Sequence, residues 1–120
     1  MTPTEIFDHV ARHLLRQGRK ARAGDGVGPV MYHAPTGDSC AIGCWIPAEA
    51  YYPGLEGFPV ENPAVLAVLP FPVDRNLLRL LVDLQLEHDA GHPPDWKAGL
   101  RKIAWKHQLG RRHWLEESGS

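Results

Sequence analysis

Cysteine and histidine occur in two pairs, each with a spacing of four residues. Cys40 and Cys44 form one pair, and His88 and His92 form the other. Two thiolates and two imidazoles would complete the tetrahedral coordination of zinc. However, Cys-x3-Cys between a strand and a turn is not a common zinc motif, and Gly91 would end a helix before His92. We therefore expect no metal or cofactor, with both cysteines packed as small apolar side chains, and we keep zinc as the alternative.

The same side chains would also support a nucleophilic thiol. His33 or His88 could accept the proton of Cys40 or Cys44, and Asp89 could orient that histidine. Such partners meet in space and not in sequence, so the spacing does not exclude them. Neither thiol lies in a cysteine-hydrolase signature. The sequence therefore leaves an enzyme open and favours a protein without catalysis.

A third candidate lies at the end of a predicted helix, where Gln85, His88 and Asp89 follow an apolar stripe. A buried amide or imidazole needs a hydrogen-bond partner. The segment 51–61 supplies groups that could pair with them: Tyr51, Tyr52 and Glu56. We expect a structural hydrogen-bond network here, with a ligand pocket as the alternative.

Basic residues concentrate at both ends of the chain. Residues 1–22 contain five bases and two acids, and residues 93–120 contain six bases and three acids, whereas 23–92 contain two bases and nine acids. If the two ends pack together, they form a basic face that suits an acidic protein or a nucleic-acid backbone. The near-neutral net charge of −1 favours a solvated, self-compensating surface over that of a dedicated nucleic-acid binder. The predicted contact residues are Arg19, Lys20, Arg22, Arg101, Lys102, Arg111, Arg112 and Trp114.

The tryptophans near the C-terminus fall into two groups. Trp96 lies on the predicted apolar stripe of the last helix and Trp105 near the edge of that stripe, so both are expected to pack. Trp114 follows Gly110 and lies outside the stripe. An exposed tryptophan at this position would anchor a partner.

Three long helices must position these residues. A capping box at Thr2 and Glu5, with Pro3 in the first turn, predicts a helix over 3–17. Asp74 and Asp95 begin apolar stripes that predict helices over 74–90 and 95–109. Proline signals add two short helices, at 47–52 and 62–69.

Two short apolar segments, 30–33 and 39–42, flank a Pro-Gly turn and predict a β-hairpin. The expected fold class is therefore α+β, with a small β-hairpin or antiparallel sheet packed against four or five helices. We expect one compact domain over 1–110 and a C-terminal tail over 111–120. The connection 18–29 is rich in glycine and is expected to be mobile. Its glycines beside basic residues could cradle a phosphate, although the spacing is not that of a Walker loop.

The composition is that of an ordinary globular protein. The chain has 120 residues, of which 43% are hydrophobic and 22% charged, and this length favours one domain. Two cysteines are too few for a disulfide framework. No apolar stretch has transmembrane length, and the N-terminus lacks the pattern of a signal peptide. We expect a cytoplasmic protein with reduced thiols and no membrane partner.

Several of these residues form a pattern that resembles small proteins encoded by phages, prophages and other bacterial mobile elements. The pattern runs through Tyr32, Pro35-x-Gly37, Cys40-Ala41-x-Gly43-Cys44-x-Ile46-Pro47, Tyr52, Glu56-Gly57, Leu84-Gln85-x-x-His88-Asp89 and Trp96. It covers most of residues 3–109. Members of this group often begin the hairpin with a cysteine, where this chain has Val30 and Met31. That departure weakens any site built on three cysteines.

The resemblance implies an accessory protein made in the bacterial cytoplasm, and it carries no established activity. Small phage accessory proteins often bind and block host machinery, including antiviral defence. The leading hypothesis is therefore a binding protein that inhibits a host protein through its basic face. A small Cys/His enzyme or ligand-binding protein and a nucleic-acid-binding protein are the alternatives. The sequence leaves the partner and the oligomeric state open.

Overall fold

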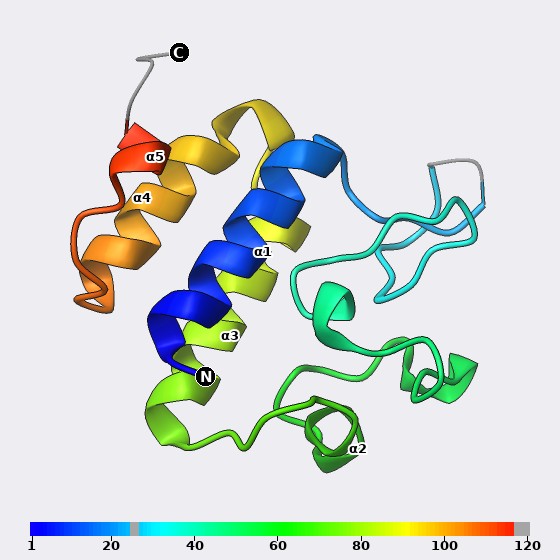
Figure 1. Ribbon diagram of the computed structural model, residues 1–120. Coiled ribbons are helices and arrows are strands. Elements are labelled where there is room, and N and C mark those ends of the chain that lie inside the picture. Colours follow the sequence, from blue (N-terminus) through cyan, green and yellow to red (C-terminus); the bar gives the residue numbers. More distant parts are fainter. Residues whose placement is uncertain (25–26, 117–120) are drawn as a thin grey trace.

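The computed structural model describes residues 1–24 and 27–116, and helices dominate this part of the chain. Three helices form the body of the protein: α1 (Pro3–Gln17), α3 (Arg75–Ala90) and α4 (Trp96–Lys106). They contact one another, and the long irregular region between α1 and α3 lies to one side of them (Figure 1). The shorter elements are α2 (Pro63–Ala67), α5 (His113–Glu116) and the 3-10 turns Gly43–Trp45, Pro53–Leu55 and Pro93–Asp95.

Local signals explain where the long helices begin and end. The Thr2 side chain accepts from the Glu5 amide, and the Glu5 side chain accepts from the Thr2 amide, so the predicted capping box is present. Gly18 ends α1 in the left-handed region, with φ of 70°. Asp74 caps α3 by accepting from the amide of Leu77. The predicted helices over 3–17 and 74–90 are confirmed, and the last helix ends earlier than predicted, at Lys106.

The apolar stripes of the three helices meet in one core. From α1 it receives Ile6, Phe7, Val10, Ala11 and Leu14; from α3 Leu77, Leu80, Leu81 and Leu84; and from α4 Trp96, Leu100, Ile103 and Ala104. The irregular region adds buried residues of its own, including Cys40, Ile42 and Leu55. The burial of these loop residues in the core holds the loops against the helices.

The predicted α+β fold is wrong, because the described residues contain no strand and no sheet. Only two isolated antiparallel bridges form, between Arg22 and Val30 and between His33 and Ser39. The physical reason is that side chains take the backbone groups that a ladder would use. The Glu56 carboxylate accepts from the amide of Tyr32 at 2.8 Å, and in a hairpin ladder that amide would donate to the Cys40 carbonyl oxygen. The 30–33 and 39–42 segments therefore lie as anchored loops.

The predicted short helix over 47–52 is also absent. Pro47 is followed by a single turn, in which the amides of Ala50 and Tyr51 both donate to the Pro47 carbonyl oxygen. The predicted helix over 62–69 is present in shorter form as α2, and Asn62 caps it by accepting from the amide of Ala64. No helix in the described residues is long and apolar enough to cross a membrane. The expected mobility of the 18–29 connection falls partly on residues 25–26, and the tail partly on 117–120, which lie outside the description.

Candidate functional site

His88 forms the centre of the polar network predicted at the end of α3. Its side chain is 0% exposed. The backbone amide of Ala21 donates to its Nε2 at 3.0 Å, and its Nδ1 lies 2.7 Å from the Asp89 carboxylate. An amide N–H is always a donor, so Nε2 must be the acceptor and Nδ1 must carry the proton that Asp89 accepts. Both ring nitrogens are therefore used to hold the segment after α1 against α3.

Gln85 extends this network to the loop that contains the cysteines. Its side-chain amide donates to the Asp89 carboxylate at 3.2 and 3.3 Å, and its oxygen accepts from the amide of Ile42 at 3.2 Å. The His88 ring also stacks on Trp96, with centroids 5.6 Å apart. The prediction brought Gln85, His88 and Asp89 together correctly, and the structure gives them fixed protein partners.

The predicted partners of this network belong to a different cluster. Glu56 accepts from the backbone amides of Tyr32 and His33 and from the hydroxyl of Tyr51, at 2.8, 3.1 and 2.7 Å. The His33 ring stacks on Tyr51 and its Nε2 donates to the Gly43 carbonyl oxygen at 2.8 Å. Glu56 thus replaces strand pairing for the 32–33 segment. Tyr52 stands apart from both clusters as an exposed side chain.

Neither cysteine has the surroundings of a nucleophile. Cys40 is fully buried, and burial raises the pKa of its thiol to about 12. Burial also raises the pKa of Cys44 well above its usual range, and its thiol donates to the Ala41 carbonyl oxygen at 3.1 Å. The thiolate is the reactive and metal-binding form, so at neutral pH both groups are thiols, with Cys40 in the core and Cys44 partly buried against it.

The four residues of the zinc alternative do not share a site in the structure. His88 uses both ring nitrogens within the protein, and His92 is exposed beyond the end of α3. Within residues 1–24 and 27–116, no group of three or more His, Cys, Asp or Glu side chains is arranged to hold a metal ion.

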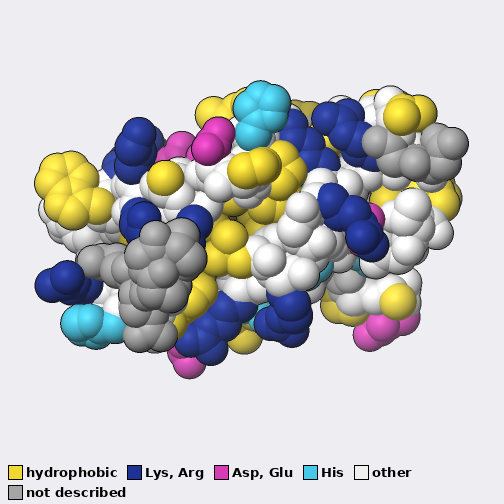
Figure 2. Space-filling view, turned by 90° about the horizontal axis from the view of Figure 1, so that it is seen from above, with side chains coloured by type: hydrophobic (Ala, Val, Ile, Leu, Met, Phe, Trp, Pro, Cys, Tyr) yellow, Lys and Arg dark blue, Asp and Glu magenta, His cyan; other side chains and the backbone are white. Residues whose placement is uncertain are grey.

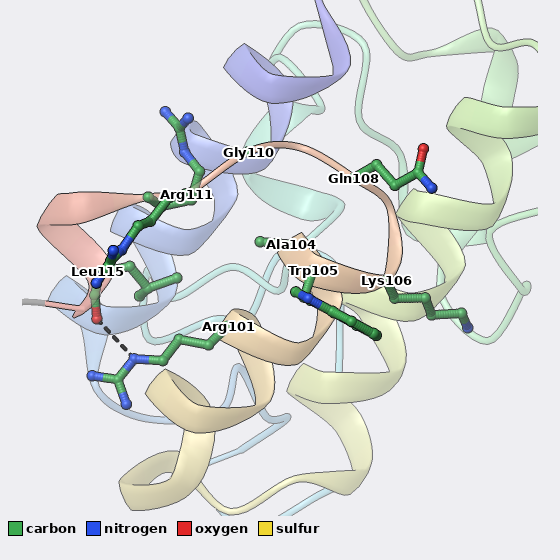
Figure 3. Close-up of a pocket in the computed structure, with 9 residues that line it drawn as sticks. Arg101, Ala104, Trp105, Lys106, Gln108, Gly110, Arg111 and Leu115 are labelled. Carbon is green, nitrogen blue, oxygen red and sulfur yellow. Dashed lines mark hydrogen bonds between the residues drawn. The ribbon is translucent and has the colours of Figure 1, made fainter.

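A groove beside α4 is the candidate binding site, and it combines the predicted contact residues Arg101, Arg111 and Arg112 with Trp105, which the sequence did not single out as a contact. It has a volume of about 790 Å³ and lies between α4 and the segment that follows it. Its lining residues are Arg101, Ala104, Trp105, Lys106, Gln108, Gly110, Arg111, Arg112 and Leu115. Arg101 reaches from α4 to the backbone oxygen of Leu115 (Figure 3). Four cations line the groove, and none of its described lining residues is acidic.

Trp105 is the most unusual residue of this groove, because its side chain is 85% exposed. The sequence placed it at the edge of the apolar stripe. A residue two positions from Ile103 lies about 200° around an α-helix, so Trp105 faces away from the core side that Ile103 occupies. A stricter reading of the helical period would have identified it as an outward-facing tryptophan.

Trp114, the predicted anchor, packs against the body of the protein. It is partly buried, and the guanidinium of Arg12 lies 4.5 Å from the centre of its ring. Its indole N–H has no hydrogen-bond partner within the described residues. Arg112 pairs with Asp8 on α1 through two hydrogen bonds, of 3.0 and 2.5 Å. Trp114 and Arg112 therefore hold the C-terminal segment in place.

The remaining predicted contact residues divide among three surfaces. Lys102 is exposed on α4, in a second groove between α3 and α4, and Arg111 lines the groove of Trp105. Arg19, Lys20 and Arg22 line a separate pocket near His92. On the face seen in Figure 2, Lys and Arg side chains are more widespread than Asp and Glu.

Comparison with protein-family models, with curated proteins and with solved structures gives no match.

Proposed function

We propose that this protein acts by binding another protein through the groove beside α4, with Trp105 as the anchor. The observation that carries the proposal is the 85% exposure of Trp105 on the rim of a groove lined by cations. Tryptophan and arginine are the residue types that contribute most to protein interfaces. A tryptophan side chain that becomes buried removes about 150–250 Å² from water, which is worth about 4–6 kcal/mol before the costs of association.

The charge of the groove favours an acidic partner. Arg101, Lys106, Arg111 and Arg112 line it, and two of these cations already have carboxylate partners inside the protein, since Asp83 pairs with Lys106 and Asp8 with Arg112. An acidic and partly apolar surface would complement the rim and cover the Trp105 ring. Such complementarity accelerates association and selects the partner.

The sequence resemblance to phage and mobile-element proteins suggests the kind of partner. We propose that the partner is a host protein of the bacterial cytoplasm, with antiviral-defence proteins among the candidates, and that binding inhibits it. The buried network around His88 supports a binding role over catalysis, because it occupies the imidazole with partners inside the protein.

Affinity capture from a bacterial lysate, with matched baits, tests this proposal. We expect a protein retained by the wild-type chain to be lost with Trp105→Ala and kept with Leu86→Ala. Leu86 is a suitable control because its side chain is also exposed, at 60%, on α3. The captured protein is then purified and titrated with both variants. Equal retention by the wild-type and Trp105→Ala baits would contradict the proposal.

Single-stranded nucleic acid is the second candidate occupant of the same groove. Exposed aromatic rings stack on bases while neighbouring cations track the phosphates, and Trp105 with Arg101 and Lys106 provides that combination. This candidate predicts an affinity for an oligonucleotide that falls steeply with salt concentration. A flat salt response, or binding that Trp105→Ala leaves unchanged, would exclude it.

A further inference from the structure

We propose a second binding site, specific for phosphate groups, in the pocket formed by Arg19, Lys20, Arg22 and His92. The pocket has a volume of about 560 Å³, which is within the range of small-ligand sites. It also includes Thr36, Asp38 and Pro93. Its residues come from three separate segments: the connection after α1, the turn around residue 37 and the segment that follows α3. The proposal is independent of the groove beside α4.

Arg19 is oriented by a fixed carboxylate. Asp38 accepts from its Nε at 2.7 Å and from one Nη nitrogen at 3.0 Å. Asp38 is itself buried and accepts a further hydrogen bond from Thr36, which fixes its position. The arginine side chain remains 70% exposed. Asp38 therefore directs the guanidinium while the remaining N–H donors stay accessible from the pocket.

Lys20 and Arg22 are held by backbone carbonyl oxygens. The Lys20 ammonium donates to the Asp89 carbonyl oxygen at 2.9 Å, at the C-terminal end of α3. Arg22 donates from one Nη nitrogen to the carbonyl oxygen of Gly28 at 3.0 Å. An ammonium has three N–H donors and a guanidinium five. Each side chain is thus positioned by one bond and retains further donors for a ligand.

The pocket collects charges that repel one another. Three cations lie within four consecutive residues, and among the described lining residues Asp38 is the one carboxylate, which Arg19 already engages. Like charges in one pocket cost free energy that a bound anion recovers. Arginine forks match the oxygens of a phosphate, and a lysine adds a compact positive charge. Side chains that are already ordered lose less entropy on binding. These features together identify a phosphate group as the ligand chemistry.

Titration calorimetry at low ionic strength, with two phosphate sources, tests the proposal. One arm uses pyrophosphate as a free phosphate compound, and the other uses a single-stranded thymidine oligonucleotide. We expect one equivalent of pyrophosphate to bind. We expect Lys20→Gln and Arg22→Gln each to weaken binding by about tenfold, because each removes one charge-assisted contact.

The matched control removes the same charge elsewhere. Arg75→Gln and Arg79→Gln change exposed arginines of α3 that lie outside the pocket, and we expect them to leave the affinity unchanged. Lys20→Arg keeps the charge and is expected to retain binding. Thermal unfolding of every variant shows whether a loss of pyrophosphate binding comes from misfolding. Where a variant misfolds, Arg22→Lys, which keeps the charge, provides a second conservative test.

The outcomes distinguish the source of the phosphate. Pyrophosphate binding that an oligonucleotide does not displace assigns the pocket to a free phosphate compound. Oligonucleotide binding that pyrophosphate competes for, and that Lys20→Gln weakens, assigns it to a nucleic-acid backbone. The proposal is overturned if neither probe binds. It is equally overturned if the Arg75→Gln and Arg79→Gln controls weaken binding as much as the pocket variants do.

Discussion

At the scale of single residues, the side chains that look most reactive in the sequence serve the structure. His88 connects the backbone of Ala21 to the carboxylate of Asp89, and Cys40 is a buried thiol. Histidine and cysteine are common in active sites, but a buried imidazole with two fixed partners is a structural element. This interpretation leads to two measurable consequences.

The first concerns His88, which we expect to be important for stability. His88→Leu leaves the buried amide of Ala21 without an acceptor and removes the proton donor of Asp89. The expected loss in the free energy of unfolding is about 2–4 kcal/mol, measured by urea denaturation. The control is His92→Gln, at an exposed position, which is expected to change stability by about 0.5 kcal/mol or less. An equally small effect of His88→Leu would show that the network contributes little.

The second concerns the pH dependence of stability, through Cys40. Its pKa is about 12 in the folded protein, against 9.0 for an unperturbed thiol. The folded state therefore binds the thiol proton more tightly, and the stability from this group is complete below pH 9.0 and falls as the pH rises toward 12. Cys40→Ala should remove a slope of up to about 1.4 kcal/mol per pH unit in this window. The measurement is the denaturation midpoint of both proteins over this range; identical slopes would contradict a buried thiol.

At the scale of elements, the C-terminal segment is attached to the helical body by a few specific contacts. Leu115 is buried, Arg101 donates to the Leu115 carbonyl oxygen, and Arg112 forms a two-bond pair with Asp8 of α1. In Figure 1, α5 lies beside α4. These contacts form one wall of the groove beside α4, so the position of this short helix determines whether the groove exists.

A double-mutant cycle on Asp8 and Arg112 tests this attachment. We expect Asp8→Asn and Arg112→Gln each to destabilise the protein, with a coupling energy of about 1–2 kcal/mol, because the pair is bidentate and only about a fifth exposed. Hydrogen exchange should accelerate at the amide of Leu115, which donates to the Arg112 carbonyl oxygen. Strictly additive effects of the two substitutions would mean that the ion pair does not hold the segment.

At the scale of the whole molecule, the two tryptophans of α4 divide between core and surface. Trp96 is 1% exposed and its indole N–H donates to the Glu87 carbonyl oxygen, whereas Trp105 is 85% exposed on the same helix. The binding role proposed for Trp105 implies that the requirements of folding and of recognition fall on separate tryptophans of α4. The two residues therefore provide a test of that separation.

We expect Trp105→Ala to leave the free energy of unfolding within about 0.5 kcal/mol of the wild-type value. Trp96→Ala is expected to cost about 3–5 kcal/mol, because it opens a cavity in the core. Both values come from chemical denaturation, and acrylamide quenching of tryptophan fluorescence should decrease in Trp105→Ala. A large destabilisation by Trp105→Ala would assign this residue to packing and remove the basis of the proposed binding surface.

The helices could be predicted from the sequence because their signals are local. The capping box at Thr2 and Glu5, the cap at Asp74 and the apolar period of each stripe all act within a few residues of the backbone that they organise. The same information placed Gln85, His88 and Asp89 together on α3. These local signals were sufficient to predict the long helices, but the proline signal at Pro47 alone was not, because the segment 47–52 forms a single turn.

The tertiary structure decided everything that depends on distant partners. Ala21 is 67 positions from His88, and Glu56 is 24 from Tyr32, yet these contacts occupy one ring nitrogen of His88 and one backbone amide that the expected hairpin would pair. A short strand and an anchored loop have the same local pattern, and only the side chain that reaches the backbone distinguishes them. Tertiary packing decided the two C-terminal tryptophans in the same way. The packed helices leave Trp105 exposed, and they provide the surface against which Trp114 packs.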